Sequence, residues 1–171
     1  MKVNKEDGTV FKISENQLIE EIENYNDVVI KLSKTLKSAN IVGTYAELLV
    51  CEKLHLKMAK KSNKDYDATA NNKKYQIKSR WNKEELESKG QNEFGSIKYQ
   101  EHGDYKFDYL VLVYFDGSLL NHKIYLIDSK DINELKENTN GKKFIYTKKD
   151  RLIIRYNDNF ISNKKVKEIW D

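Results

Sequence analysis

The most constraining feature of this sequence is an unbroken apolar run from Tyr109 to Phe115. A run without a polar face is typical of a β-strand covered on both sides, as in the centre of a parallel or mixed sheet. Segments with helical and strand patterns alternate along the rest of the chain. This order favours an α/β or α+β fold with a mixed central sheet flanked by helices. The 171 residues suffice for one domain with its own core.

The first part of the chain is predicted to be mainly helical. Residues 9–13 favour a short strand, and Ser14 with Gln17 forms a capping box that opens a helix. An apolar stripe with helical spacing then comprises Leu18, Ile22, Tyr25, Val29, Leu32 and Leu36. Core packing and a dimer seam both account for the stripe, and we prefer core packing. Residues 1–39 are taken as a helical extension of a single domain spanning residues 1–171.

Residues 40–130 are predicted to form the core of this domain, and residues 131–171 a C-terminal elaboration. Helices are expected at 44–54, 83–88 and from Asp131 to Gly141, and strands at 56–60, 109–115, 123–127, 144–147 and 152–156. Residues 90–106 read as a polar loop with one helical turn. An amphipathic segment at 166–170 is expected to pack Ile169 and Trp170 back onto the domain.

Two short strands joined by a tight turn at Asn71-Asn72 are predicted next, because asparagine tolerates the left-handed conformations of such turns. With the turn centred there, Asp67 lies opposite Gln76. Opposite residues share a face, with Cβ atoms roughly 5 Å apart. Lys78 shares this face because side chains alternate along a strand. A carboxylate, an amide oxygen and an ammonium group therefore converge, a set that can hold a divalent cation and contact a phosphate.

Basic residues are concentrated around this hairpin. Residues 53–83 hold ten lysines and arginines against two aspartates, although the whole chain has a net charge of only +4. Such a local surplus suits docking to a polyanion such as nucleic acid, while a solvated lysine-rich face gives the same pattern. The candidate nucleic-acid contacts are Lys64, Lys73, Lys74, Arg80 and Lys83.

Glu47 is a further candidate, on the helix expected at 44–54. The apolar stripe of this helix runs through Gly43, Val50 and Leu54, and Glu47 falls on the same stripe. An inward-facing carboxylate costs on the order of several kcal/mol unless it is paired or bound to a cation. Glu47 therefore either sits at the edge of the stripe and reaches water, or lies near a metal ion.

Three segments in this order resemble the PD-(D/E)XK nuclease superfamily, which has the restriction-endonuclease-like fold. They are GTYAELLV at 43–50, KDYD at 64–67 and YQIK at 75–78. In that superfamily a helix glutamate precedes a strand aspartate, and an acidic-x-lysine triplet follows on the next strand. The apolar segment at 107–114 resembles the strand after the core helix. Gln76 departs from the pattern, which has Asp or Glu at this position.

The resemblance implies a metal-dependent nuclease that hydrolyses phosphodiester bonds, most readily of DNA, as a restriction or defence-type endonuclease. Mg²⁺, with Mn²⁺ as a substitute, would be held by Asp67, the side-chain oxygen of Gln76 and the carbonyl of Ile77. Glu47 would hold a water on this ion or a second ion. Lys78 would orient or help deprotonate the attacking water and stabilise the transition state.

Because Gln76 removes one negative charge from the site, a second interpretation stays open. The domain could be a weak or inactive nuclease that binds nucleic acid or a partner subunit. Cleavage of both strands of a duplex by one site per chain would suggest a homodimer, but no residue fixes the oligomeric state. Target sequence, DNA versus RNA, and single versus double strand are equally open.

Other kinds of site find no support in the sequence. A Gly-rich phosphate loop, a Ser-His-Asp order and a dinucleotide fingerprint are all missing, so no organic cofactor is expected. No apolar run reaches the length of a membrane span, the start lacks a signal peptide, and a cytoplasmic location is expected. The single cysteine, Cys51, is predicted to pack in the core. His102 is the one histidine placed to act as a general base.

Overall fold

The computed structural model of the chain describes residues 2–4, 10–12, 15–36, 38–60, 63, 65–82, 93–137 and 144–170. The chain divides into two compact units, Met1–Ile41 and Val42–Asp171. This boundary lies close to the predicted end of the helical extension at residue 39. The predictions that involve Ser14, the helix at 83–88 and Gly141 lie outside the described residues.

The first unit contains a short hairpin and one long helix. Strands β1 (Lys2–Asn4) and β2 (Val10–Lys12) pair in antiparallel fashion, and α1 spans Glu15–Leu36. The helix predicted from the apolar stripe is thus confirmed, whereas β1 was not anticipated. Where the side chains of α1 are described, none is buried, and Leu32 on the stripe is 41% exposed. Core packing of the stripe therefore finds no support within this unit, and the dimer seam stays a prediction.

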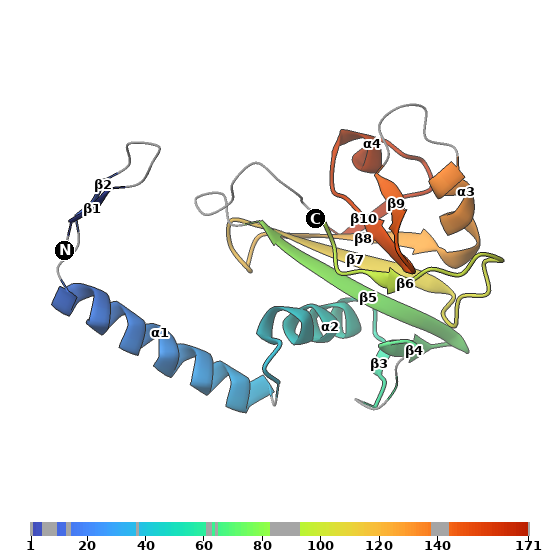
Figure 1. The fold of residues 1–171 in the computed structure, drawn as a ribbon. Helices are drawn as coiled ribbons and strands as arrows, with labels where there is room; N and C mark the ends of the chain where they lie inside the picture. Colours follow the sequence, from blue (N-terminus) through green and yellow to red (C-terminus); the bar gives the residue numbers. More distant parts are fainter. Residues whose placement is uncertain are drawn as a thin grey trace. The chain divides into compact units, whose positions relative to one another are not determined.

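The second unit contains two sheets and the remaining helices (Figure 1). Its elements are α2 (Ile41–Lys53), β3 (Lys57–Met58), β4 (Ala68–Ala70), β5 (Lys73–Asn82), β6 (Ile97–Lys98), β7 (Tyr109–Asp116), β8 (His122–Asp128), the 3₁₀ helix η1 (Ser129–Asp131), α3 (Ile132–Glu137), β9 (Ile145–Lys148), β10 (Arg151–Ile154), α4 (Asp158–Ile161) and β11 (Lys167–Trp170). Six strands form one sheet in the order β11-β8-β7-β5-β4-β3, and three form a second in the order β6-β10-β9. Because β5 and β7 are parallel and the other pairs antiparallel, the large sheet is mixed, as predicted.

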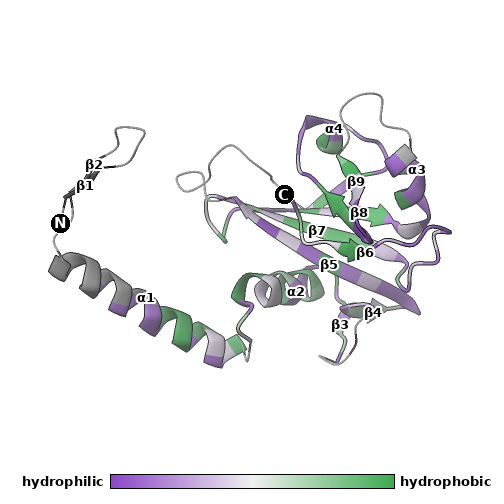
Figure 2. Cartoon of the chain, in the orientation of Figure 1, coloured by the Kyte–Doolittle hydropathy of each residue, from purple (hydrophilic) through white to green (hydrophobic). Residues whose placement is uncertain are grey.

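Strand β7 is the buried centre of this unit. It lies between β5 and β8, and every residue from Leu110 to Phe115 is buried. Helix α2 covers one face of the large sheet, and the small sheet with α3 and α4 covers the other (Figure 1). Figure 2 shows β7 and much of α2 in the hydrophobic colour, whereas β5 is largely hydrophilic. The central strand predicted from the apolar run is confirmed.

Alternate residues of β7 point into two separate cores. Leu110 and Leu112 pack in the core that faces the small sheet, whereas Val111 and Val113 pack against α2. Strand β5 repeats this alternation because it runs parallel to β7 in a continuous register. Gln76, Lys78 and Arg80 therefore share one face of β5, and Ile77 lies on the other.

Three local predictions need correction. The second strand of the predicted hairpin, β5, is longer than the short strand expected and continues to Asn82, because pairing with β7 extends it. The described part of the loop predicted at 90–106 contains strand β6, which pairs with β10, and no helical turn. The segment at 166–170 includes strand β11, where Ile169 packs in the core facing α2 as predicted, while Trp170 is 40% exposed and contacts α2 through Lys53, whose Nζ lies 4.1 Å from the ring centre.

Candidate functional site

The hairpin of β4 and β5 has the predicted register. Ala68 pairs with Tyr75, which centres the turn on Asn71 and Asn72. These two asparagines have positive φ angles of 49° and 61°. Such angles are those of the tight turn whose twist matches the flanking strands. The prediction from the asparagine pair is therefore confirmed.

Asp67 is fixed in place immediately before β4. Its backbone N–H donates to the carbonyl oxygen of Tyr75 at 2.8 Å, and its own carbonyl accepts from Ala59 at 2.8 Å. Its Oδ2 atom accepts the backbone N–H of Ile77 at 2.7 Å. Because Ile77 lies beyond the last residue paired with β4, this carboxylate takes the place of a strand carbonyl. The aspartate is thus positioned by main-chain contacts from Ala59, just after β3, and from β5.

Gln76 is the one buried polar side chain among the described residues, with 8% of its surface exposed. Its Nε2 group donates a hydrogen bond to Asp67 Oδ2. We predicted that Gln76 presents its side-chain oxygen to a cation here, but the amide turns its nitrogen to Asp67. The reason is that an ionised carboxylate can only accept hydrogen bonds. A glutamate at this position would instead place a second negative charge against Asp67.

Lys78 completes the cluster on this face of β5. Its Nζ atom lies 3.9 Å from Asp67 Oδ2, and the Lys78 side chain is 25% exposed. Gly95 packs against the stem of this lysine, since a Cβ atom at Gly95 would lie only 3.1 Å from Lys78 Cδ. The missing side chain at Gly95 therefore leaves the room in which Lys78 lies. No local pattern predicts this contact, because Gly95 and Lys78 lie in distant segments.

Asp67, Gln76 and Lys78 line a cavity of about 410 Å³. Among its other lining residues are Ser96, Lys98, Gln100, Tyr105, Lys106 and Arg151. Four basic side chains outnumber two acidic ones around this cavity. Burial raises the pKa of Tyr105 to about 12, so its hydroxyl keeps its proton at neutral pH. None of these additional residues was predicted as part of the site, because they belong to loops and to the small sheet.

Glu47 comes from the opposite side of the sheet. Helix α2 packs Ala46 and Val50 against the face that carries Ile77, and Glu47 is half-buried on this helix. Glu47 is not part of the cavity lining. Gln76 and Lys78 point to the other face, but the charges of Glu47 and Asp67 both act on the Cys51 thiol, and Glu47 stays a predicted residue of the site. Glu47 therefore lies at the edge of the buried face of α2, beside its buried residues Ala46, Leu49 and Val50.

Cys51 lies within the electrostatic range of both candidate carboxylates. Burial, followed by the charges of Glu47 and then Asp67, raises the pKa of its thiol to about 11. The side chain is half-buried and packs in the core that faces α2, as predicted. The thiol is therefore protonated and unreactive at neutral pH.

A metal ion in this cluster would have few anionic ligands. In the part of the chain that the structure describes, no three His, Cys, Asp or Glu side chains lie close enough together to hold an ion. Mg²⁺ is nevertheless commonly bound through one or two carboxylates while keeping several waters. Asp67, the Gln76 oxygen and the Ile77 carbonyl form a fitting donor set for this ion once the Gln76 amide turns over.

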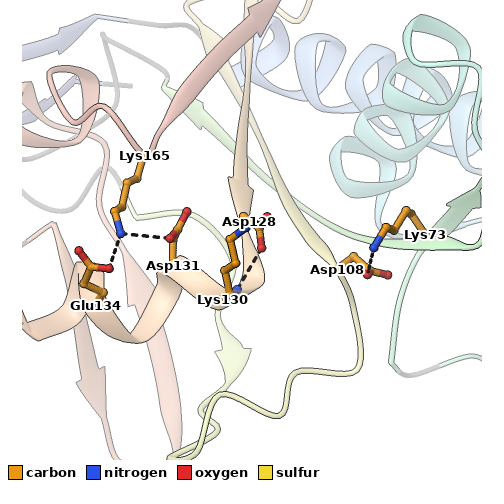
Figure 3. Close-up of polar contacts among 7 residues, drawn as sticks. All are labelled: Lys73, Asp108, Asp128, Lys130, Asp131, Glu134 and Lys165. Carbon is orange, nitrogen blue, oxygen red and sulfur yellow. Dashed lines mark hydrogen bonds and ion pairs between the residues drawn. The ribbon is translucent and has the colours of Figure 1, made fainter.

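The two lysines predicted at the hairpin tip have partners within the protein. Lys73 Nζ lies 2.8 Å from Asp108 Oδ1 (Figure 3), and Lys74 Nζ lies 5.2 Å from the ring centre of Tyr66. The hydrogen bond from Lys73 and a second from the Lys74 backbone lower the pKa of Asp108. Asp108 thereby ties the start of β5 to the start of β7. Both lysines remain exposed.

Of the other predicted residues, the structure describes Arg80 and His102. Arg80 is half-buried and follows Gln76 and Lys78 on the same face of β5. Lys64 and Lys83 lie outside the described residues. His102 is exposed in the loop before β7 and does not line the cavity.

Comparisons with known proteins add no assignment to this geometry. A scan of the chain against protein-family models finds no match, and a search among curated proteins finds none either. Among the described helices, none combines the length and apolar character needed to cross a bilayer. A function has therefore to be inferred from the side chains of the site.

Proposed function

We propose that this protein is a metal-dependent nuclease that hydrolyses phosphodiester bonds, most readily of DNA, on a core of the PD-(D/E)XK type. The observation that carries this proposal is the meeting of Asp67, Gln76 and Lys78 at the wall of a mainly basic cavity. The likeness of three sequence segments, in the order found in that superfamily, supports it further. A restriction or defence-type endonuclease is the class that best fits these features.

Each side chain has a separate task in this proposal. Asp67 is the fixed anionic ligand, and the Gln76 oxygen and Ile77 carbonyl complete the protein's share of the cation site. A bound Mg²⁺ supplies a Lewis acid that lowers the pKa of the attacking water and offsets negative charge on the phosphate. Lys78 holds a positive charge beside the carboxylate, where charge develops on the scissile group. Glu47, on α2, would act through water or a second ion.

Cleavage of plasmid DNA with Mg²⁺ or Mn²⁺ tests this proposal. The wild-type protein is expected to cut, and Asp67→Asn to lose at least about 100-fold in rate, since it removes the fixed charge at nearly constant shape. Asp27→Asn is a matched control, because it removes the same charge from an exposed position on α1. Inactive wild-type protein, or an Asp67→Asn variant as active as the control, would contradict the proposal.

A second candidate is a nuclease-like domain that binds nucleic acid, or a partner subunit, without cutting. The hydrogen bond from Gln76 to Asp67 favours it, because the amide satisfies the carboxylate without a cation. Retention on DNA that falls steeply with salt, without cleavage in either metal, would support nucleic-acid binding. Absence of any retention at low salt would point to a partner subunit instead.

A further inference from the structure

The small sheet carries a line of basic side chains across its width. Arg151 in the central strand β10 pairs directly with Lys98 of β6 on one side and with Lys148 of β9 on the other. Paired residues of adjacent strands project from the same face, with Cβ atoms roughly 5 Å apart. All three side chains are exposed. We call Lys98, Arg151 and Lys148 the basic ladder.

This arrangement is unfavourable for the protein alone, because like charges placed opposite each other destabilise a sheet. Within the described residues, no carboxylate forms an ion pair with any member of the basic ladder. Glu93, which forms an isolated bridge with Arg155, is bonded to Arg155 at 3.0 Å and to Tyr146, and the more distant charge of Lys148 also lowers its pKa. The stability of the small sheet comes from its other face, where Leu152 is fully buried. A ligand with several negative charges would offset the repulsion within the ladder.

The basic ladder leads directly to the candidate site. Lys98 and Arg151 line the same cavity as Asp67 and Lys78, while Lys148 lies on the far strand of the small sheet. Charges therefore continue from the proposed point of chemistry onto an exposed sheet surface. A chain of regularly spaced phosphates is the polyanion that such a path fits.

The size and lining of the cavity distinguish between a single strand and a duplex. Its volume of about 410 Å³ lies within the range of pockets for small molecules, roughly 300–1,000 Å³, so one nucleotide can enter it, and a nucleotide of a duplex would first have to leave its base stack. Tyr105 and Phe107 line its wall, and Tyr105 is the one of the two that is partly exposed, since Phe107 is only 7% exposed. A basic path beside aromatic side chains is the combination by which proteins bind single strands.

We infer that the basic ladder binds the sugar-phosphate backbone of a single-stranded nucleic acid, one nucleotide of which enters the cavity beside Asp67. This inference rests on the proposed function for the identity of the ligand, but the binding itself requires no cleavage. It assigns Lys98, Lys148 and Arg151 to substrate binding, in addition to the lysines at the tip of the β4–β5 hairpin.

Binding of a fluorescent single-stranded oligonucleotide by the full chain, measured by anisotropy in EDTA, tests the inference without cleavage. In the double variant Lys98→Gln/Arg151→Gln, the magnitude of the slope of log affinity against log salt should decrease by about 1.4. Two phosphate contacts are lost, and each contributes about 0.7 on a single strand. Lys164→Gln/Lys167→Gln is the matched control. This control removes two exposed charges at and just before β11, which forms the edge of the large sheet opposite β3. The salt slope of its binding should equal that of the wild type.

Two results would overturn the inference. One is an equal change of slope in the ladder and control variants, which would mean that only total charge matters. The other is tighter binding of a blunt duplex of the same sequence than of the single strand. A thermal melt of both variants excludes unfolding as the cause, and the ladder variant should be at least as stable as the wild type because repulsion is relieved.

The same measurements separate this inference from the proposed function. Ladder-dependent binding without cleavage in Mg²⁺ or Mn²⁺ would uphold single-strand binding and remove the nuclease activity. If the wild-type protein cleaves DNA but the ladder variant keeps the full salt slope, the nuclease proposal stands and the single-strand binding by the ladder is excluded.

Discussion

The two faces of strand β5 obey different physical demands. On one face, Ile77 is 4% exposed and packs against α2 together with Val111. On the other, Gln76 and Lys78 line a polar cavity. Because side chains alternate along a strand, a shift of the pairing by one residue would exchange the two sets. The burial of the apolar face therefore fixes which polar side chains reach the cavity. Residues that stabilise the fold and residues that line the site alternate along the strand.

The polar face is tolerated because its buried member is satisfied locally. Gln76 bonds to Asp67, which in turn accepts the backbone N–H of Ile77. A buried polar group costs little once it is hydrogen-bonded. Substitutions on each face of β5 test whether one face serves folding and the other activity.

The largest effect on folding is expected for Ile77→Ala. Truncation of a fully packed isoleucine should lower the free energy of unfolding by about 2–4 kcal/mol, through lost burial and a residual cavity. Urea unfolding followed by tryptophan fluorescence measures this change. Ile161→Ala, at a position that is 46% exposed, is the control and should change stability by less than about 0.5 kcal/mol. A similar loss of unfolding free energy in the two variants would mean that burial of the α2-facing side of β5 does not fix the register.

The adjacent substitution Lys78→Met is expected to have the opposite profile. It keeps the length of the side chain and removes its charge, so stability should change by less than about 0.5 kcal/mol while cleavage falls by about 100-fold or more. The cleavage rate and urea unfolding are measured on the same preparation. Lys167→Met, exposed on β11, serves as the control. Loss of stability without loss of cleavage would assign Lys78 to folding.

The substitution Gln76→Glu tests how charge on the polar face of β5 affects both Mg²⁺ binding and stability. A second carboxylate should tighten Mg²⁺ binding by about tenfold, or about 1.4 kcal/mol. Without the ion, the two carboxylates repel, which raises the pKa of the pair in the folded state. Stability in EDTA should therefore fall as pH rises above about 4, the ordinary range of carboxyl groups, and recover in acid.

Calorimetry and thermal melts with and without Mg²⁺ measure both effects of Gln76→Glu. Gln76→Leu removes the amide without adding charge and controls for the lost hydrogen bond. Unchanged Mg²⁺ affinity in Gln76→Glu would exclude Gln76 from the ligands.

The smallest effect is expected at Cys51, which lies on the α2 side of the sheet. Its thiol pKa is raised from 9.0 to about 11. Above pH 9 the unfolded chain loses this proton while the folded chain keeps it, so the contribution to stability falls as pH rises from about 9 to about 11. Cys51→Ala should lack this part of the pH dependence.

Alkylation of the native protein by iodoacetamide measures the thiol directly. The rate should rise with a midpoint near pH 11, and the Asp67→Asn variant should shift this midpoint slightly downward because one negative charge is lost. A midpoint at or below pH 9 in the wild-type protein would show that Cys51 is neither buried nor within range of these carboxylates.

Local sequence signals were sufficient where the determining contacts are local. The asparagine pair fixed the register of the β4–β5 hairpin, and that register places Asp67 beside Gln76 and Lys78. The apolar run identified the central strand in the same way. Gly95 and the pairing of Lys98 with Arg151 could not be predicted, because each joins segments that are distant in the chain.

Alternation and turn chemistry act over a few residues, so they were enough to predict the helices with a clear stripe, the central strand and the residues of the hairpin that share a face. The rest of the site was set by the tertiary structure. It turned the Gln76 amide toward Asp67, left Glu47 on the α2 side of the sheet, and placed the small sheet beside β5 to close the cavity. These outcomes depend on how whole layers pack, and packing is set by the sum of many contacts rather than by any one segment.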